Sequence, residues 1–150
     1  MRRTMLFLPG NTPNMLINGD TLGADTIIFD LEDAVSPDEK DAARILVRNA
    51  LRYQYYPGCE TVVRINPTDT AFWKEDLKAV IPLKPDVIMP TKVSGGDMIR
   101  EVSACMAEVE RENKMEEGTV KILPLIETAM GVEKAFDIAS ADTRVMGVCL

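Results

Sequence analysis

Short apolar runs alternate along this chain with longer amphipathic segments, and this alternation constrains the fold more than any other feature of the sequence. The runs are rich in Val, Ile, Leu and Phe, a composition typical of strands buried on both faces of a parallel sheet. Strand–helix–strand repeats with short connections predict parallel strands joined by right-handed crossovers. We therefore expect six strands, within residues 5–8, 26–29, 61–65, 87–89, 122–126 and 145–150.

The amphipathic segments predict five helices. The clearest start is at Ser36, where Pro37 follows and Glu39 completes the pattern of a capping box with proline in the first turn. Apolar residues recur at helical spacing after this start and again in two later segments. The expected helices occupy residues 14–22, 36–51, 73–81 and 99–109, and one more begins after Thr128.

Two folds are compatible with this pattern: an open doubly wound α/β sheet and a parallel (β/α)8 TIM barrel. Both bind ligands at the carboxyl ends of their strands. The nucleotide-binding form of the open sheet is disfavoured, because the sequence contains neither a GxGxxG after the first strand nor a GxxxxGK[ST]. A barrel takes about 250 residues, whereas this chain has 150 and ends in an apolar run. We predict that residues 1–150 form a single incomplete TIM-barrel domain, its N-terminal portion, cut after the sixth strand.

Composition excludes several classes of function. Histidine is absent, so this stretch contains no Ser-His-Asp triad, no His-ligated zinc site and no imidazole base. The net charge of −7 argues against nucleic acid and anionic membranes as partners. The sequence also lacks an apolar stretch long enough to span a bilayer. Its three cysteines form no CxxC pair, which indicates reduced structural thiols and a cytoplasmic location.

Polar residues follow the expected strands directly. Because the carboxyl ends of parallel strands meet at one edge, we expect these side chains to converge on one mouth. Arg64 lies inside an apolar run and should face carboxylates of the protein or of a ligand. Glu127 is placed to hold a hard cation. The strand-end residues are Asp30, Glu32 and Asp33 after the second strand, Arg64 and Asn66 after the third, Lys92 after the fourth, and Glu127 and Thr128 after the fifth.

Each of these residues also has a simpler interpretation. The acidic cluster and Glu127 are compatible with turn formation and helix capping, and Arg64 with a structural ion pair. Lys92 fits a solvated loop, and Thr128 fits a helix N-cap better than a ligand. Taken together, however, they supply oxygen ligands for Mg²⁺, one guanidinium and no imidazole. That combination suits a substrate with an α-keto or α-hydroxy carboxylate, which the metal chelates and the arginine binds through its planar fork.

The motifs, in this order, resemble those of the HpcH/HpaI aldolase superfamily, which includes citrate lyase β subunits and the malyl-CoA and citramalyl-CoA lyases. The resemblance runs through nearly the whole chain. It rests on RTMLFLPGN at residues 3–11, GAD at 23–25, FDLEDAV at 29–35, EKDAAR at 39–44, VVRIN at 62–66 and IET at 126–128.

The resemblance implies a Mg²⁺-dependent TIM barrel that acts as a homo-oligomer and cleaves a 3-hydroxy-acyl thioester by retro-Claisen chemistry. In the citrate lyase branch the substrate is a citryl thioester on an acyl carrier protein, the products are oxaloacetate and an acetyl thioester, and α and acyl-carrier subunits are partners. The family's catalytic, substrate-binding arginine falls on Arg64. Its first Mg²⁺ ligand, which also touches the substrate, falls on Glu127. Asp30, Glu32 and Asp33 would order metal-bound water or pair with Arg64.

Two departures and two alternatives accompany this resemblance. Relatives have Pro-Lys adjacent after the fourth strand, whereas Thr91 separates Pro90 from Lys92 here, which puts a role for Lys92 in doubt. The family's second Mg²⁺ ligand is an Asp just beyond the sixth strand, so it is expected beyond Leu150, and residues 1–150 alone would hold an incomplete metal site. The alternatives are a lyase for CoA-linked malyl or citramalyl thioesters and a non-catalytic fragment or scaffold.

Overall fold

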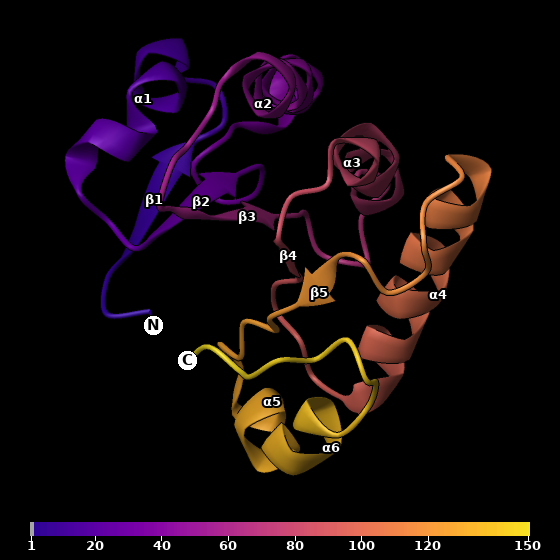
Figure 1. Ribbon diagram of the computed structural model, residues 1–150. Helices are drawn as coiled ribbons and strands as arrows, with labels where there is room; N and C mark the ends of the chain where they lie inside the picture. Colours follow the sequence, from indigo (N-terminus) through magenta and orange to yellow (C-terminus); the bar gives the residue numbers. More distant parts are fainter. Residues whose placement is uncertain (1) are drawn as a thin grey trace.

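Five parallel strands form one sheet in the computed structural model, which describes residues 2–150. Each strand pairs with its neighbour in sequence, in the order β1-β2-β3-β4-β5 (Figure 1). A doubly wound sheet reverses its strand order at a switch point, whereas a TIM barrel adds its strands in chain order. This topology therefore confirms the barrel-type fold. The strands are β1 Met5–Pro9, β2 Thr26–Asp30, β3 Glu60–Arg64, β4 Val87–Met89 and β5 Lys121–Ile122.

The sixth expected strand is only partly formed. Residues 145–150 run parallel to β5 but make two isolated bridges, Ile122 with Val145 and Leu125 with Cys149, instead of a continuous ladder. The expected fifth strand over residues 122–126 is shorter for a related reason. Pro124 stands in the middle of that run, and proline has no backbone N–H to donate to a ladder.

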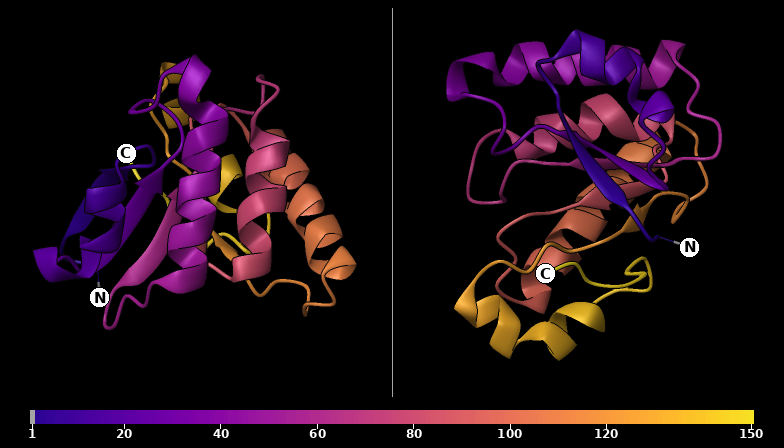
Figure 2. Two further views of the ribbon diagram at one scale, coloured as in Figure 1. Left: turned by 90° about the horizontal axis from the view of Figure 1, so that it is seen from above. Right: turned by 90° about the vertical axis from the view of Figure 1, so that its left-hand side faces the viewer.

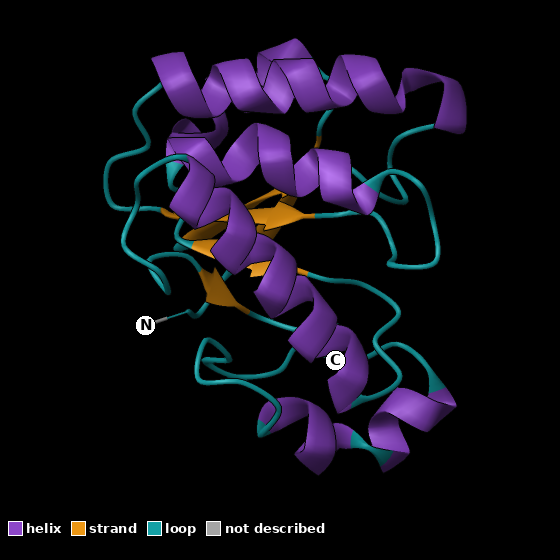
Figure 3. Ribbon diagram, turned by 90° about the vertical axis from the view of Figure 1, so that its right-hand side faces the viewer, coloured by secondary structure: helices purple, strands orange, loops and turns teal. Residues whose placement is uncertain are grey.

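The helices form a layer outside the strands. Figure 1 shows α1 to α4 in an arc around the sheet, and Figures 2 and 3 show α2, α3 and α4 lying side by side across it. The expected fifth helix is divided at Lys134 into two short pieces, so the part of the chain described holds six α-helices and not five. They are α1 Pro13–Ile17, α2 Lys40–Tyr53, α3 Trp73–Val80, α4 Gly96–Glu112, α5 Ala129–Glu133 and α6 Ala135–Ala139.

The predicted capping box at Ser36 is wrong in its details. Residues Pro37–Glu39 form a 3₁₀ turn before α2, and the Ser36 side chain makes no capping bond to the backbone. Its hydroxyl lies 3.2 Å from Glu39 Oε2, and the carboxylate also accepts from Asn11 Nδ2 at 2.7 Å. The Glu39 side chain therefore ties the start of α2 to the loop after β1 and does not cap the helix.

Two apolar clusters lie on the two faces of the sheet. Ile27 belongs to the larger cluster beneath the helices, and its neighbour Ile28 to the smaller one on the opposite, inner face. Because side chains alternate with a period of two along a strand, Asp30 shares the face of Ile28, and Arg64 shares that of Val62. The sheet therefore aims both polar residues inward at its carboxyl edge. The inner cluster consists of Ile28, Val62, Val87, Met89, Leu123 and Leu125.

Within residues 2–150, the helices all fall short of the length and apolar character needed to cross a bilayer. The three cysteines are free thiols, and each is half-buried.

Candidate active site

Asp30 and Arg64 form a two-pronged ion pair at the inner carboxyl edge of the sheet. The two residues are register partners on adjacent strands, so the ladder itself places them side by side. Arg64 Nε donates to Asp30 Oδ1 at 2.7 Å, and Nη2 donates to Oδ2. The Asp30 carboxylate also accepts the backbone N–H groups of Glu32 at 2.8 Å and Ala34 at 3.2 Å. Asp30 is thus fully engaged in holding Arg64 and the loop that follows β2.

The remaining edge of the Arg64 guanidinium faces the mouth of the site. Nη1 lies 3.5 Å from Glu32 Oε2. The Phe7 ring packs against the guanidinium, and the distance from Arg64 Cζ to the ring centroid is 4.8 Å. Burial disfavours the charge, but the bonds to Asp30 and the nearby carboxylates of Glu32 and Glu127 outweigh it and raise the pKa of Arg64. Arg64 is therefore a fixed cation, held by Asp30 through Nε and Nη2, with Nη1 directed toward Glu32.

Lys92 joins the loops that follow β2 and β5. Its backbone N–H donates to Glu127 Oε1 at 2.9 Å, and its Nζ lies 2.9 Å from Glu32 Oε1. The residue adopts a left-handed conformation with φ of 53°, which non-glycine residues seldom adopt outside constrained sites. The bond to Glu32 raises the pKa of Lys92. Lys92 is thus an exposed loop lysine, as the simpler interpretation has it, and it also contacts two residues of the site.

Glu32 lies between the two cations. Its oxygens face Arg64 and Lys92, while Glu127 is exposed and is held at one oxygen by the Lys92 backbone. The structure therefore brings together four of the strand-end residues, Arg64, Glu32, Lys92 and Glu127, around Asp30. These contacts run in series from Arg64 to Glu32, from Glu32 to Lys92 and from Lys92 to Glu127, and we call this group of residues the rim.

Three other strand-end residues lie outside this group. Asp33 is exposed and contributes to the site only as a distant negative charge that favours the protonated form of Lys92. Asn66 is buried and donates from its backbone and side-chain nitrogens to Asp76 Oδ2, at 3.1 and 2.7 Å. Thr128 is the N-cap of α5, and its hydroxyl accepts from the Gly131 N–H at 3.0 Å.

Two residues of the site have no counterpart among the sequence-based candidates. Phe7 lies on β1, and the period-two alternation that places Met5 against the inner cluster could have placed Phe7 on that face as well. Lys40 is buried at the start of α2, and its Nζ donates to the backbone of the loop after β2. Its position on a helix, away from the strand ends, gave no local signal.

The oxygen donors of the site can be compared with the needs of a Mg²⁺ ion, which prefers carboxylate and carbonyl oxygens. Across residues 2–150, groups of three or more Asp, Glu or Cys side chains that could hold a metal ion do not occur. The acidic cluster after β2 is therefore no metal cage, because Asp30 and Glu32 are engaged by cations. Glu127 keeps an oxygen with no bond to Lys92, and a carboxylate oxygen is the ligand that Mg²⁺ prefers. The chain thus fits the ion as the source of one ligand.

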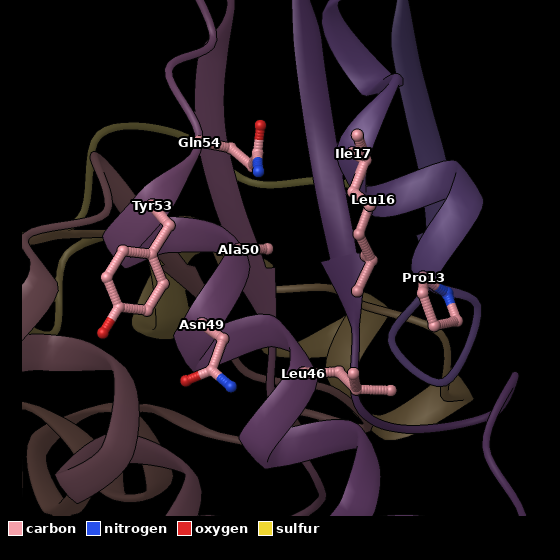
Figure 4. A pocket seen from close by; sticks show the side chains of 8 residues that line it. All are labelled: Pro13, Leu16, Ile17, Leu46, Asn49, Ala50, Tyr53 and Gln54. Atoms are coloured by element: carbon pink, nitrogen blue, oxygen red, sulfur yellow. The ribbon is translucent and has the colours of Figure 1, made fainter.

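A separate apolar cavity of about 180 Å³ lies between α1 and α2 (Figure 4). Leu16, Ile17 and Leu46 line its apolar wall, and Tyr53 lies at its far end. None of its lining residues is charged, and it lies in the helix layer and not at the carboxyl edge of the sheet. It is distinct from the rim that holds Arg64.

Gly131 allows α5 to approach the loop after β4. A Cβ at this position would overlap the carbonyl oxygen of Val93, the residue after Lys92. We expect Gly131→Ala to lower the free energy of unfolding by about 1–3 kcal/mol, because the backbone must shift to relieve the overlap. The matched control is Gly147→Ala, whose Cβ would meet only ordinary contact at 3.7 Å. Urea unfolding of both variants tests this, and equal stabilities would contradict it.

Comparison with known proteins adds an independent observation. The family model described as HpcH/HpaI aldolase/citrate lyase matches residues 3–150. A citrate lyase subunit beta from Leuconostoc mesenteroides subsp. cremoris is 45% identical over 150 residues, which is 100% of this chain and 50% of the relative. A (3S)-malyl-CoA thioesterase from Cereibacter sphaeroides is 35% identical over 148 residues, which is 99% of this chain and 48% of the relative.

Solved structures give the same result at the level of the fold. A citrate lyase beta subunit from M. tuberculosis, complexed with oxaloacetate and magnesium, superposes with a TM-score of 0.74 at 30% identity. The match covers 96% of this chain and 55% of that one. The chain therefore spans about half the length of the relatives it matches.

Proposed function

Since this chain belongs to the HpcH/HpaI aldolase/citrate lyase family, we propose that it supplies half of the active site of a Mg²⁺-dependent carbon–carbon lyase acting on a 3-hydroxy-acyl thioester. The observation that carries the proposal is that Arg64 and Glu127 are linked at the carboxyl edge of a parallel sheet, through the contacts of Glu32 and Lys92. They supply one fixed guanidinium and one exposed carboxylate. Ligands of barrel enzymes bind at this edge.

The substrate we propose is a citryl group on an acyl carrier protein, cleaved to oxaloacetate and an acetyl thioester. Support comes from the citrate lyase subunit beta of L. mesenteroides and from the M. tuberculosis structure with oxaloacetate and magnesium. In this proposal the partners are α and acyl-carrier subunits, the protein is a cytoplasmic homo-oligomer, and the barrel is completed by sequence following Leu150.

Arg64 binds the substrate in this mechanism. Its Nη1 donates to the carboxylate of the oxaloacetate portion or to the oxygen that becomes the ketone, while Asp30 keeps the guanidinium in place through Nε and Nη2. In cleavage, the hydroxyl gives its proton to a base and becomes the ketone, while the electrons of the breaking carbon–carbon bond pass to the thioester carbonyl. The resulting enolate then takes up a proton to give the acetyl thioester. A fixed cation stabilises the charge that develops on oxygen during cleavage.

Glu127 would hold the Mg²⁺ ion, with a second carboxylate ligand from sequence following Leu150. When bound, the ion supplies Lewis-acid polarisation of the hydroxy-carboxylate portion. Lys92 orients Glu127 through its backbone N–H, so the direction of this carboxylate is set by the loop after β4.

A second candidate function is hydrolysis or cleavage of a CoA thioester such as malyl-CoA or citramalyl-CoA. The observation that favours it is the 35% identity to a (3S)-malyl-CoA thioesterase. Assays of protein extended to the length of the relatives, with citryl-carrier, malyl-CoA and citramalyl-CoA substrates, discriminate between the two. A requirement for the carrier protein would favour the citrate lyase function.

A non-catalytic scaffold would explain the Arg64–Asp30 pair without any ligand. We expect the extended protein to bind oxaloacetate in a Mg²⁺-dependent manner and Glu127→Gln to weaken this binding by about 10- to 100-fold, because removal of a carboxylate ligand weakens a metal site. Calorimetric titration of Mg²⁺, with and without oxaloacetate, measures this. Asp33→Asn is the matched control, since Asp33 is an exposed carboxylate in the loop after β2 that lies outside the group of contacting site residues. Equal affinities of Glu127→Gln and wild type would contradict the proposal.

A further inference from the structure

Lys40 is a buried lysine whose ammonium group contacts backbone and not a carboxylate. The residue is 8% exposed at the start of α2. Its Nζ donates to the carbonyl oxygen of Leu31 at 2.8 Å and to that of Glu32. Buried carbonyl groups require a donor, and these two lie in the irregular segment after β2, outside the strand ladder. The Glu32 carbonyl also accepts the Val35 N–H at 3.2 Å, whereas the donor to the Leu31 carbonyl is Lys40.

The loop that Lys40 holds is the loop that carries the site. Glu32 lies in it, and the Glu32 carboxylate separates the cations of Arg64 and Lys92. The same loop is fixed on its other side by two bonds: Leu31 N–H donates to the Arg64 carbonyl at 2.9 Å, and Glu32 N–H donates to Asp30 Oδ1 at 2.8 Å. Lys40 therefore closes the ring of contacts that sets where the Glu32 side chain points.

A buried ammonium group lowers stability through desolvation unless hydrogen bonds to neighbouring groups offset that cost. Burial lowers the pKa of Lys40, and the carboxylates of Glu32, Asp30 and Asp76 oppose that effect. A methionine would fill the same volume without the desolvation cost, but it would leave the Leu31 carbonyl oxygen without its donor and the Glu32 carbonyl oxygen with the Val35 N–H alone. Lys40 thus joins the first turn of α2 to the loop that carries Glu32.

We propose that Lys40 is a positioning residue that sets the orientation of Glu32 opposite Arg64 and Lys92, through its bonds to the Leu31 and Glu32 carbonyls. This inference rests on the proposed lyase function. It assigns a role to the EKDAAR segment that the residues of the rim do not explain. It also predicts that Lys40 affects the ligand only through the loop after β2, because its Nζ is bonded to the backbone carbonyls of that loop.

The experiment compares Lys40→Met, Lys40→Arg, Glu32→Gln and the double variant Lys40→Met/Glu32→Gln, all in protein of the relatives' length. We expect Lys40→Met to lower kcat/KM for citryl-thioester cleavage by about 10- to 100-fold, the effect typical of lost support behind ligand-contacting groups. Lys40→Arg should recover part of this loss, since a guanidinium can also donate to two carbonyls. In the Glu32→Gln background, Lys40→Met should cost less than about threefold, because coupled residues are not additive.

A control variant at another buried cation, far from the rim, distinguishes a loss of stability from a loss of positioning. Arg144 pairs with Glu110 next to Val120, which precedes β5 and therefore lies at the opposite edge of the sheet. Arg144→Met is expected to reduce stability but to leave kcat/KM of the folded fraction unchanged, with all assays made below the melting temperature of each variant. An equal loss of kcat/KM in Arg144→Met would show that Lys40→Met acts by destabilisation alone.

The remaining outcomes distinguish the two proposals. If Lys40→Met and Glu32→Gln multiply their effects independently, or if Lys40→Met keeps wild-type kcat/KM while Arg64→Ala loses it, the positioning role of Lys40 is overturned and the lyase function stands. If Arg64→Ala also keeps wild-type activity, the proposed function of the rim is itself wrong. Recovery by Lys40→Arg together with non-additivity supports the inference.

Discussion

Replacing Arg64 by alanine is expected to lower kcat/KM for thioester cleavage by about 100- to 1,000-fold, the range found when one preorganised donor to a developing oxyanion is removed. The Arg64 side chain is 13% exposed, and Asp30 holds its guanidinium on two nitrogens, so the cation is already in place when the substrate arrives. Steady-state kinetics on protein of the relatives' length, with the citryl thioester, measure the effect.

The control for this prediction also removes the Asp30 charge, which Arg64→Ala leaves without a partner. In Arg64→Ala, the buried Asp30 carboxylate loses its partner, and breaking a buried pair in this way typically costs about 3–5 kcal/mol of stability. Arg64→Ala/Asp30→Asn removes both charges and should recover much of that stability while remaining inactive. Near-normal kcat/KM in the double variant would contradict the substrate-binding role of Arg64.

Arg64→Lys tests how much of the effect of Arg64 on activity comes from its positive charge and how much from its planar shape. An ammonium group is a point charge without the planar fork, so it cannot hold both Asp30 oxygens and also direct an N–H toward the mouth. We expect activity between those of wild type and Arg64→Ala.

The barrel-type fold could be predicted because its main determinants are local. Short apolar runs and amphipathic segments alternate along the chain, and short crossovers between parallel strands leave few topologies. The structure differs from the predicted elements where a tertiary contact or a single residue determines where a helix or strand begins or ends. Pro124 interrupts the fifth run, and Asp137 Oδ2 accepts the Gly96 N–H at 2.8 Å, which ties α6 to the start of α4. Helical periodicity carries no information about a bond of that kind.

The candidate site was predictable to the extent that it depends on strand ends. Asp30 and Arg64 are brought together by the register of β2 and β3, which aligns the carboxyl ends of the two parallel strands. The roles of Lys92 and Lys40 depend instead on a left-handed backbone and on the direction of a buried side chain. Neither is encoded by residue type at one position, so both required the structure.

The largest expected loss of stability away from the site is in Arg144→Met. Arg144 donates from Nη2 to Glu110 Oε2 at 2.6 Å and from Nη1 to Oε1 at 3.0 Å, and Glu110 has no exposed surface. The carboxylate also accepts the N–H groups of Gly118 and Val120. We expect the variant to lose about 3–5 kcal/mol in the free energy of unfolding at pH 7, because a buried charge is left without its partner. Urea unfolding measures this loss.

The pH dependence of that loss gives a sharper test. In the wild type, burial works against the charge of Glu110, but the bonds from Arg144, Gly118 and Val120 outweigh it and lower its pKa below 4.5. Its contribution to stability is therefore present above that pH and is lost as the pH falls through the lowered value. In Arg144→Met, burial is no longer opposed by the guanidinium, so the folded state favours the protonated acid and gains stability as the pH falls.

The cost of Arg144→Met should thus be smaller at pH 5 than at pH 7. Arg144→Met/Glu110→Gln, which contains no charge at the site, should show a smaller cost that does not change over this range. A cost of Arg144→Met that is the same at both pH values would mean that the Glu110 charge is solvated once its partner is removed. The buried ion pair would then contribute to the fold through packing and not through its charges.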